Sequence, residues 1–311
     1  MKRSYAVSAT ALCVIVVVAC GPAQAWGLKG HTIIGRAAVA RMPVDLPAFI
    51  QTTGAKDEIV YLQDEEDRLK IGVGQDRAWA REWTTDHYLD IGDDGLVGGV
   101  VSLDALPATR DDFIKALWDS PKHVDAYSEG FVPYAILEGY EQVRADFALW
   151  RLAPADERAE RASLTIHDIG VFAHFVGDGS QPLHTTVHFN GWGDYPNPNG
   201  YTTSRTFHAD YEDVFVDAHL SAEDVIPLVG PAVVLPDAPL AEIGRYLAKS
   251  NAQVVPLYSL AKRGALASGA PSDAQAAAIK LSAVQLAAAA TMLDSLIETA
   301  WRASATLKAD D

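Results

Sequence analysis

Residues 174–184 have the sequence His174-Phe-Val-Gly-Asp-Gly-Ser-Gln-Pro-Leu-His184 and lie at the end of a strongly apolar stretch. Apolar residues recur through 163–177 at three- and four-residue spacing, which predicts a helix. His174 and Asp178 are four residues apart and therefore share one face of that helix. The Gly-Ser-Gln-Pro sequence that follows ends the helix and turns the chain, so that His184 can come back towards the same point. Imidazole and carboxylate groups that meet at a helix end are typical of a compact zinc site.

Helical periodicity also dominates the rest of the chain, because apolar residues recur at helical spacing in 32–41, 238–262 and 272–308. Alternating strand patterns are rare, and residues 92–101 predict a small hairpin at most. Residues 190–205 are rich in Gly, Pro, Asn and Tyr and predict a long surface loop. We therefore predict an all-α, single-domain multi-helix bundle with long loops and a zinc cluster in a cleft.

The first 25 residues have the pattern of a secretory signal peptide. Met1-Lys2-Arg3 is basic, residues 5–19 are apolar, and Ala23-Gln24-Ala25 is a small-x-small cleavage site. The mature domain would then be 26–311, exported to the periplasm or secreted. Val17-Val18-Ala19-Cys20 also resembles a lipoprotein cleavage box, and a cut there would leave a lipidated Cys20 as the first residue.

The mature composition limits the classes of partner. Both cysteines lie in the leader, so 26–311 contain none, and an exported domain without disulfides needs a good core or a metal. Without Lys2 and Arg3 the chain has 23 basic and 41 acidic side chains, a formal net charge of −18. That charge disfavours tight binding of polyanions, although bound zinc would neutralise it locally. No later apolar run is expected to cross a membrane, and nothing in the sequence implies a stable protein partner.

A second histidine–carboxylate pair, His208 and Glu212, has the same four-residue spacing, and His31 and His87 precede both pairs. Each pair alone is typical of a surface or capping contact, but two pairs together with His184 indicate a multi-ligand zinc site. The remaining histidines lie outside these motifs and are predicted to be surface or structural residues: His123, His167, His188 and His219.

The segment AHFVGDGSQPLHT, residues 173–185, resembles the core motif of the zinc-dependent phospholipase C and S1/P1 nuclease superfamily. The opening Trp26-Gly-Leu-Lys-Gly-His31, the sequence His87-Tyr-Leu-Asp90 and the long C-terminal helices extend the resemblance over most of 26–311. The resemblance implies a hydrolase that cleaves phosphate ester bonds with three zinc ions.

The resemblance also implies the ligands. His87, His174 and Asp178, with an upstream aspartate, would hold the first zinc ion. The second and more exposed ion would be held by His184, His208 and Glu212. The third would be held by His31, a bridging Asp178, and the amine and carbonyl of Trp26. Only cleavage after Ala25 frees that amine.

The upstream aspartate has three candidates in the sequence: Asp64, Asp67 and Asp76. Members of the superfamily place an aspartate before the motif at His87, and in the nucleases a basic residue follows it three positions later. Asp67 with Lys70 fits that spacing, whereas Asp64 is followed at that spacing by an acidic residue. By this resemblance Asp67 would ligate zinc and orient the attacking water, and Lys70 would contact the phosphate.

The resemblance implies that the substrate is a phospholipid or a single-stranded nucleic acid. The sequence Thr206-Phe-His-Ala-Asp-Tyr-Glu212 resembles the phospholipases C, because the nucleases have asparagine before the histidine and aspartate as the last ligand. The N-terminal motif resembles the nucleases. We expect the phospholipase type; the alternatives are an S1/P1-type nuclease, a phosphomonoesterase or a non-catalytic zinc-stabilised binding module. Aromatic residues of the long loop, predicted to be exposed, could meet a lipid surface or stack on a base: Trp192, Tyr195 and Tyr201.

Overall fold

The structure is a computed structural model that describes residues 26–70, 83–236 and 239–308, apart from the side chain of Lys70. The predicted signal peptide, 1–25, and Asp76 lie outside the described residues. Within those residues the chain is mostly helical, which confirms the predicted all-α class. The longer helices are α1 (Gly27–Arg41), α2 (Thr53–Leu62), α5 (Arg110–Trp118), α7 (Val132–Leu152), α8 (Arg158–Asp178), α12 (Pro239–Asn251), α13 (Val254–Lys262) and α14 (Ser272–Ala303).

Short elements connect these helices. They are α3 (Glu65–Lys70), α6 (Ala126–Glu129), α9 (Phe207–Ala209), α10 (Asp217–His219), α11 (Ala222–Val225), the π-helix η3 (Asp210–Val216), and the 3-10 turns η1 (Leu103–Ala105), η2 (Pro182–Thr185), η4 (Ile226–Leu228) and η5 (Ser304–Thr306). The predicted hairpin is confirmed as a minimal antiparallel pair of β1 (Leu96–Val97) and β2 (Val101–Ser102).

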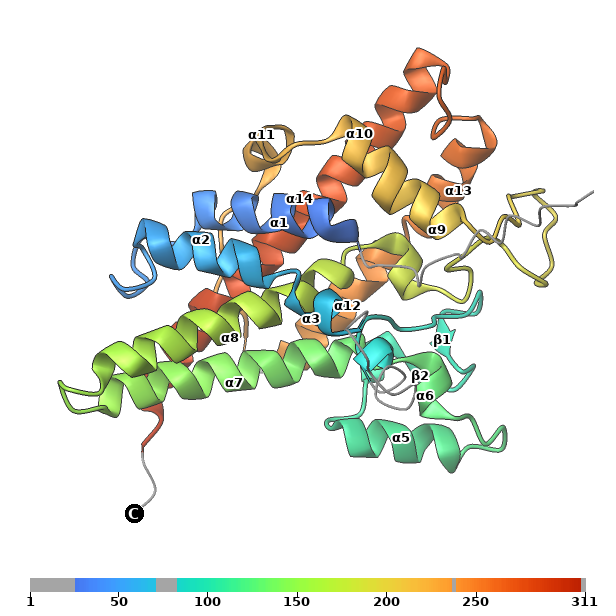
Figure 1. Cartoon of the computed structure of the whole chain (residues 1–311). Helices are drawn as coiled ribbons and strands as arrows, with labels where there is room; N and C mark the ends of the chain where they lie inside the picture. Colours follow the sequence, from blue (N-terminus) through green and yellow to red (C-terminus); the bar gives the residue numbers. More distant parts are fainter. Residues whose placement is uncertain (1–25, 71–82, 237–238, 309–311) are drawn as a thin grey trace, which may run out of the picture.

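Helices α7 and α8 lie side by side, with α1 and α2 above α8, while α14 crosses behind them (Figure 1). Helix α14 packs against α1, α7 and α8, so it closes the core from the other side. The core contains aromatic side chains that are completely buried, including those of Phe113, Phe147 and Tyr258. Helices α1 and α8 are also in contact inside the bundle, α1 at its N-terminal end and α8 at its C-terminal end.

Helix α1 begins at Gly27, before the predicted start at Thr32. Gly27 and Gly30 hide the helical periodicity, but close packing requires a glycine at both positions. Gly27 has a left-handed φ of +55°, and a Cβ on Gly30 would lie 2.8 Å from the Cβ of Trp26. This tight first turn brings His31 into the interior.

The predicted turn after Asp178 is present. Helix α8 ends at Asp178, and the side chain of Gln181 accepts a hydrogen bond from the Leu183 amide at 2.7 Å. Pro182 then opens the turn η2, where a missing N–H costs nothing. His184 is thereby returned beside the end of α8.

The helical stretch predicted over 238–262 is divided into α12 and α13. The physical reason is Pro256, which has no N–H and whose ring would clash with a continuous preceding turn. Proline is tolerated in the first turn of α13, so the chain ends one helix and starts another.

One segment, Ser272–Thr306, is long and apolar enough to cross a membrane by length and composition, contrary to our expectation that no later segment would be. Its most apolar window is 50% buried inside the protein. Its inward face consists of residues such as Leu286, Leu293 and Ile297, which are completely buried in the bundle. Packing in the core therefore accounts for the apolar character of this helix.

Asp294 is a carboxylate in that buried face, 0% exposed, and neither carboxylate oxygen has a hydrogen-bond partner in the described part of the chain. Burial raises its pKa well above 3.8, and Lys56 opposes the change only partly. Because the folded state holds this proton more tightly than the unfolded state, its contribution to stability is present below about pH 4 and is lost as the pH rises.

We expect Asp294→Asn to raise the free energy of unfolding by about 2 kcal/mol at neutral pH, since the amide carries no charge to bury. The gain should increase as the pH rises above about 4, by up to about 1.4 kcal/mol per pH unit while the buried carboxyl stays protonated. Urea unfolding of the wild-type and variant proteins at a series of pH values measures it. Asp273→Asn, at the exposed start of the same helix, should show no such gain.

Candidate metal centre

The first cluster contains a carboxylate and two imidazoles that contact one another. Asp178 and His174 project from the last turns of α8, and His87 lies in the turn that follows residues 83–85. The Asp178 Oδ2 atom is 3.0 Å from His87 Nδ1 and 3.3 Å from His174 Nε2, and those two nitrogens are 2.9 Å apart. All three residues are buried, and they could hold one metal ion together.

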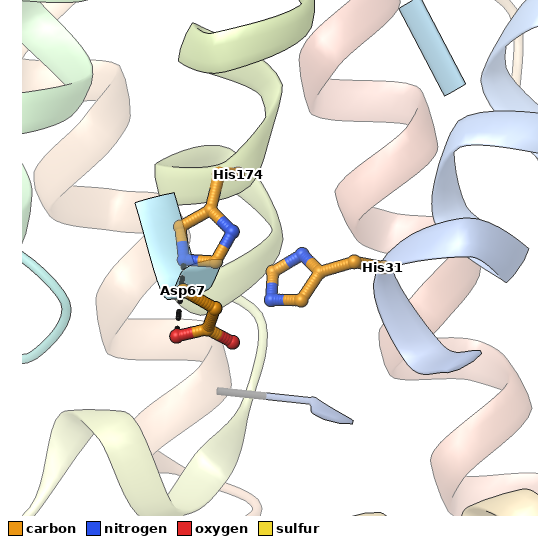
Figure 2. A group of neighbouring side chains, drawn as sticks. All are labelled: His31, Asp67 and His174. Carbon is orange, nitrogen blue, oxygen red and sulfur yellow. Dashed lines mark ion pairs between the residues drawn. The ribbon is translucent and has the colours of Figure 1, made fainter. Parts of the chain in front are cut away.

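His31 and Asp67 extend this cluster from α1 and α3. Figure 2 shows their side chains and the imidazole of His174 converging on one point. The rings of His31 and His174 stack with centroids 4.1 Å apart, and Asp67 Oδ1 lies 3.9 Å from His174 Nε2. His31 Nε2 is 3.4 Å from the Oδ1 atom of Asp178. The Asp178 carboxylate therefore lies close to His31 as well as to His87 and His174.

The structure separates the candidate upstream aspartates. Asp67 is completely buried in the cluster, and its Oδ1 atom is also 3.9 Å from His87 Nδ1. Asp64 is also buried, and its Oδ2 atom pairs with Arg68 at 3.4 Å. The side chain of Lys70 lies outside the described part of the chain.

The second cluster contains His184, His208 and Glu212. Nε2 of His184 is 3.1 Å from Nε2 of His208, which is 2.9 Å from Oε2 of Glu212. Gln181 donates a hydrogen bond to the same carboxylate oxygen at 2.9 Å, a contact that the sequence did not predict. Glu212 lies in the π-helix η3, a distortion of helical winding that is frequent at functional sites. Asp178 Oδ1 is 3.9 Å from Nδ1 of His184, so Asp178 lies between both clusters.

Backbone carbonyls orient three of the rings. Nδ1 of His174 donates to Gln63 O at 2.6 Å, Nδ1 of His184 to His87 O at 2.5 Å, and Nδ1 of His208 to Phe189 O at 3.1 Å. Because Nδ1 carries the proton in each of these bonds, the Nε2 atom is left with a free lone pair that points towards the other residues of its cluster. This arrangement is typical of metal-binding histidines, whose second nitrogen donates to a carbonyl or carboxylate.

The electrostatics of the buried carboxylates fit a cation. Burial alone would raise the pKa of Asp178, but the imidazoles of His174, His184 and His31 outweigh it and hold that pKa well below its usual range. Burial raises the pKa of Glu212 to about 7, opposed by His208 and Gln181.

Several polar atoms of this region have no hydrogen bond in the described part of the chain, although they are buried. They are Oδ1 of Asp178, Oε1 of Glu212 and both ring nitrogens of His31. Buried polar atoms without partners are costly, and a bound cation would satisfy these. Imidazole and carboxylate donors are the ligands that zinc takes in proteins, so the donor set fits zinc.

Trp26 lies against the first cluster. Its indole is completely buried and donates hydrogen bonds to Gly177 O at 3.0 Å and to Ser180 Oγ at 2.8 Å, on either side of Asp178. Its backbone has a left-handed φ of 36°. Whether its amine is freed depends on residues outside the described part, so its role as a ligand stays a prediction.

The prediction of an exposed aromatic loop was wrong for two of its three residues. Residues 190–205 do form a loop, but Trp192 is only 5% exposed and Tyr201 8%, whereas Tyr195 is 46% exposed. Trp192 packs against Tyr201 and Tyr258 with ring centroids 4.6 and 5.0 Å apart, so these rings anchor the loop. Among the histidines outside the motifs, His188 is buried, and three are exposed: His123, His167 and His219.

Gly177 is a further residue that shapes the centre, because a Cβ there would lie 2.9 Å from both Cε1 and Nδ1 of His31. We expect Gly177→Ala to displace that ring and to weaken zinc binding about tenfold. Zinc titration against a competing chelator measures the loss. Gly54→Ala makes the same change on a helix where nothing lies within 4 Å, and it should leave zinc binding unchanged.

No family model matches the chain, and no curated protein matches it either. Among solved structures, an alpha-toxin of Clostridium perfringens from avian strain SWCP is similar, with 13% identity and a TM-score of 0.45 over 89% of this chain. An alpha-toxin of Clostridium absonum has 11% identity and a TM-score of 0.45 over 91% of this chain. The chain spans 65% and 67% of their respective lengths.

Proposed function

We propose that the protein is a zinc-dependent phosphodiester hydrolase of the phospholipase C type. The observation that carries this proposal is the position of Asp178, whose carboxylate contacts the first cluster through Oδ2 and faces His31 and His184 through Oδ1. Two histidine–carboxylate clusters that share one carboxylate fit a multinuclear zinc centre, and we infer three ions. The ligands would be Trp26, His31, Asp67, His87, His174, Asp178, His184, His208 and Glu212.

Zinc, when bound, supplies a lowered pKa for water and positive charge for the phosphoryl oxygens. Asp67 would accept the proton of the attacking water; its buried carboxylate near His31 and His174 supports this role. Lys70, three residues further on, would contact the phosphate. Gln181 holds the carboxylate of Glu212 in place.

The cavity beside the second cluster supports a phospholipid substrate. It has a volume of about 910 Å³ and is lined by Phe189 and Asn190, which accept hydrogen bonds from His208 Nδ1 and from its backbone amide, respectively. The exposed ring of Tyr195 also lines it, as do acidic Asp90 and Asp194 and basic Arg205. Aromatic faces and carboxylates together attract an ammonium headgroup.

The test is a comparison of phosphatidylcholine with single-stranded DNA and RNA as substrates of the purified mature protein. We expect diacylglycerol and no release of nucleotides. Release of 3′-hydroxyl and 5′-phosphate ends would instead establish the nuclease, and turnover of phosphomonoesters alone would establish a phosphomonoesterase. Bis-p-nitrophenyl phosphate with and without chelator tests catalysis itself, since tightly bound zinc without hydrolysis would indicate a binding module.

We further propose that the chain is exported, to the periplasm or the medium, and cleaved after Ala25, so that the amine of Trp26 is available to zinc. N-terminal sequencing of the protein recovered outside the cytoplasm tests this. An N-terminus at Trp26 supports the proposal, whereas a lipidated Cys20 would overturn both the cleavage site and the ligand role of Trp26.

A further inference from the structure

His188 makes several contacts through its ring and its backbone, although it is not part of either cluster. Its ring stacks on Trp192 with centroids 3.8 Å apart and an interplanar angle of 13°. Its Nδ1 atom is 3.2 Å from Trp192 O, and its Nε2 atom is 2.9 Å from Oδ1 of Asp93. The hydroxyl of Tyr258 donates to His188 O at 2.5 Å. His188 is 2% exposed, and its stacking and hydrogen bond with Trp192 connect the two ends of the segment 188–192.

The two residues that follow His188 orient a predicted zinc ligand. Phe189 O accepts the hydrogen bond of His208 Nδ1 at 3.1 Å, and Oδ1 of Asn190 accepts that of the His208 backbone amide at 3.2 Å. These contacts fix both the ring and the backbone of His208. No other hydrogen bond from its Nδ1 atom is found in the described part of the chain.

The same segment forms a wall of the cavity described above. Tyr195 places its ring at right angles to His188, with centroids 4.8 Å apart and an interplanar angle of 80°. Phe189, Asn190 and Tyr195 all line the cavity. A shift of His188 would therefore move the acceptors of His208 and the cavity wall together.

We propose that His188 and Asp93 are positioning residues that hold His208 in the orientation needed to bind zinc. This inference rests on the proposed zinc centre. Partners behind a ligating histidine set its tautomer and ring direction, and their loss lowers metal affinity by about 10- to 100-fold. Here the partner is the carbonyl of Phe189, and its position depends on the clamp formed by Asp93, His188 and Trp192.

The test measures the zinc affinities of the mature protein by competition with chelators of graded strength. His188→Phe keeps a ring to stack on Trp192 but loses the hydrogen bonds at both nitrogens. Asp93→Ala removes only the carboxylate, which is 60% exposed and can be deleted without opening the core. His219→Phe is the matched control on the exposed surface.

We expect His188→Phe and Asp93→Ala to weaken one zinc site about tenfold and to leave the others unchanged. KM for the substrate should rise in both variants, because Tyr195 moves with the clamp. Should His188→Phe fail to fold, as judged by circular dichroism, Asp93→Ala decides alone. Affinities equal to those of the wild type in a folded variant would overturn this inference, whereas a wild type that binds no zinc would overturn the metal centre itself.

Discussion

Asp178→Asn is expected to release zinc and to lower turnover by roughly two to four orders of magnitude. The carboxylate contacts His87 and His174 and faces His31 and His184, so one substitution removes a partner from both clusters. Removing one member of a buried charged group costs about 3–5 kcal/mol. The amide has one oxygen and no negative charge, and it cannot replace the carboxylate at either position.

Metal content by elemental analysis and turnover of bis-p-nitrophenyl phosphate together measure this effect. Asp168→Asn is the matched control, because Asp168 lies on the same helix but contacts His167 and Gln142 outside both clusters. The control should keep its zinc. A variant at Asp178 that retains a full zinc complement and near-normal turnover would contradict the shared role of this carboxylate.

Asp67→Asn should reduce turnover by about 10²- to 10⁴-fold, the range found when a general base is lost. Its carboxylate is completely buried where the rings of His31 and His174 stack. An asparagine there can fill the space but cannot accept a proton. We therefore expect kcat to fall more than KM rises.

Asp64→Asn is the control that separates the two candidates of the sequence. Asp64 is three residues away, and its Oδ2 atom pairs with Arg68. The Asp64→Asn variant should retain near-normal turnover of bis-p-nitrophenyl phosphate. If Asp64→Asn were inactive and Asp67→Asn active, the assignment would be reversed.

The helical spacing of the sequence was sufficient to predict the all-α class and the pairing of His174 with Asp178 on α8. Both properties depend on residues close together in the chain. The turn at Gln181 and Pro182, which returns His184 beside Asp178, was also readable from local composition.

Properties that depend on distant contacts could not be predicted in the same way. Turn-forming residues indicated the loop 190–205, but only the packing of Trp192 on Tyr258 shows that its large ring faces inward. Asp64 and Asp67 lie in one acidic segment, but Asp67 Oδ1 lies 3.9 Å from the imidazoles of His87 and His174, whereas Asp64 pairs with Arg68. The role of Gln181 depends on Glu212, which is 31 residues away.

The complete burial of Trp26 bears on the proposed cleavage after Ala25. A peptidase that cuts after Ala25 needs an extended chain on both sides of the bond, but the indole of Trp26 is held by Gly177 O and Ser180 Oγ in the finished bundle. If the chain is exported and cut after Ala25, as proposed above, cleavage would precede folding of the bundle. The metal would then be acquired outside the cytoplasm, so zinc supply in that compartment would determine how much exported chain becomes active.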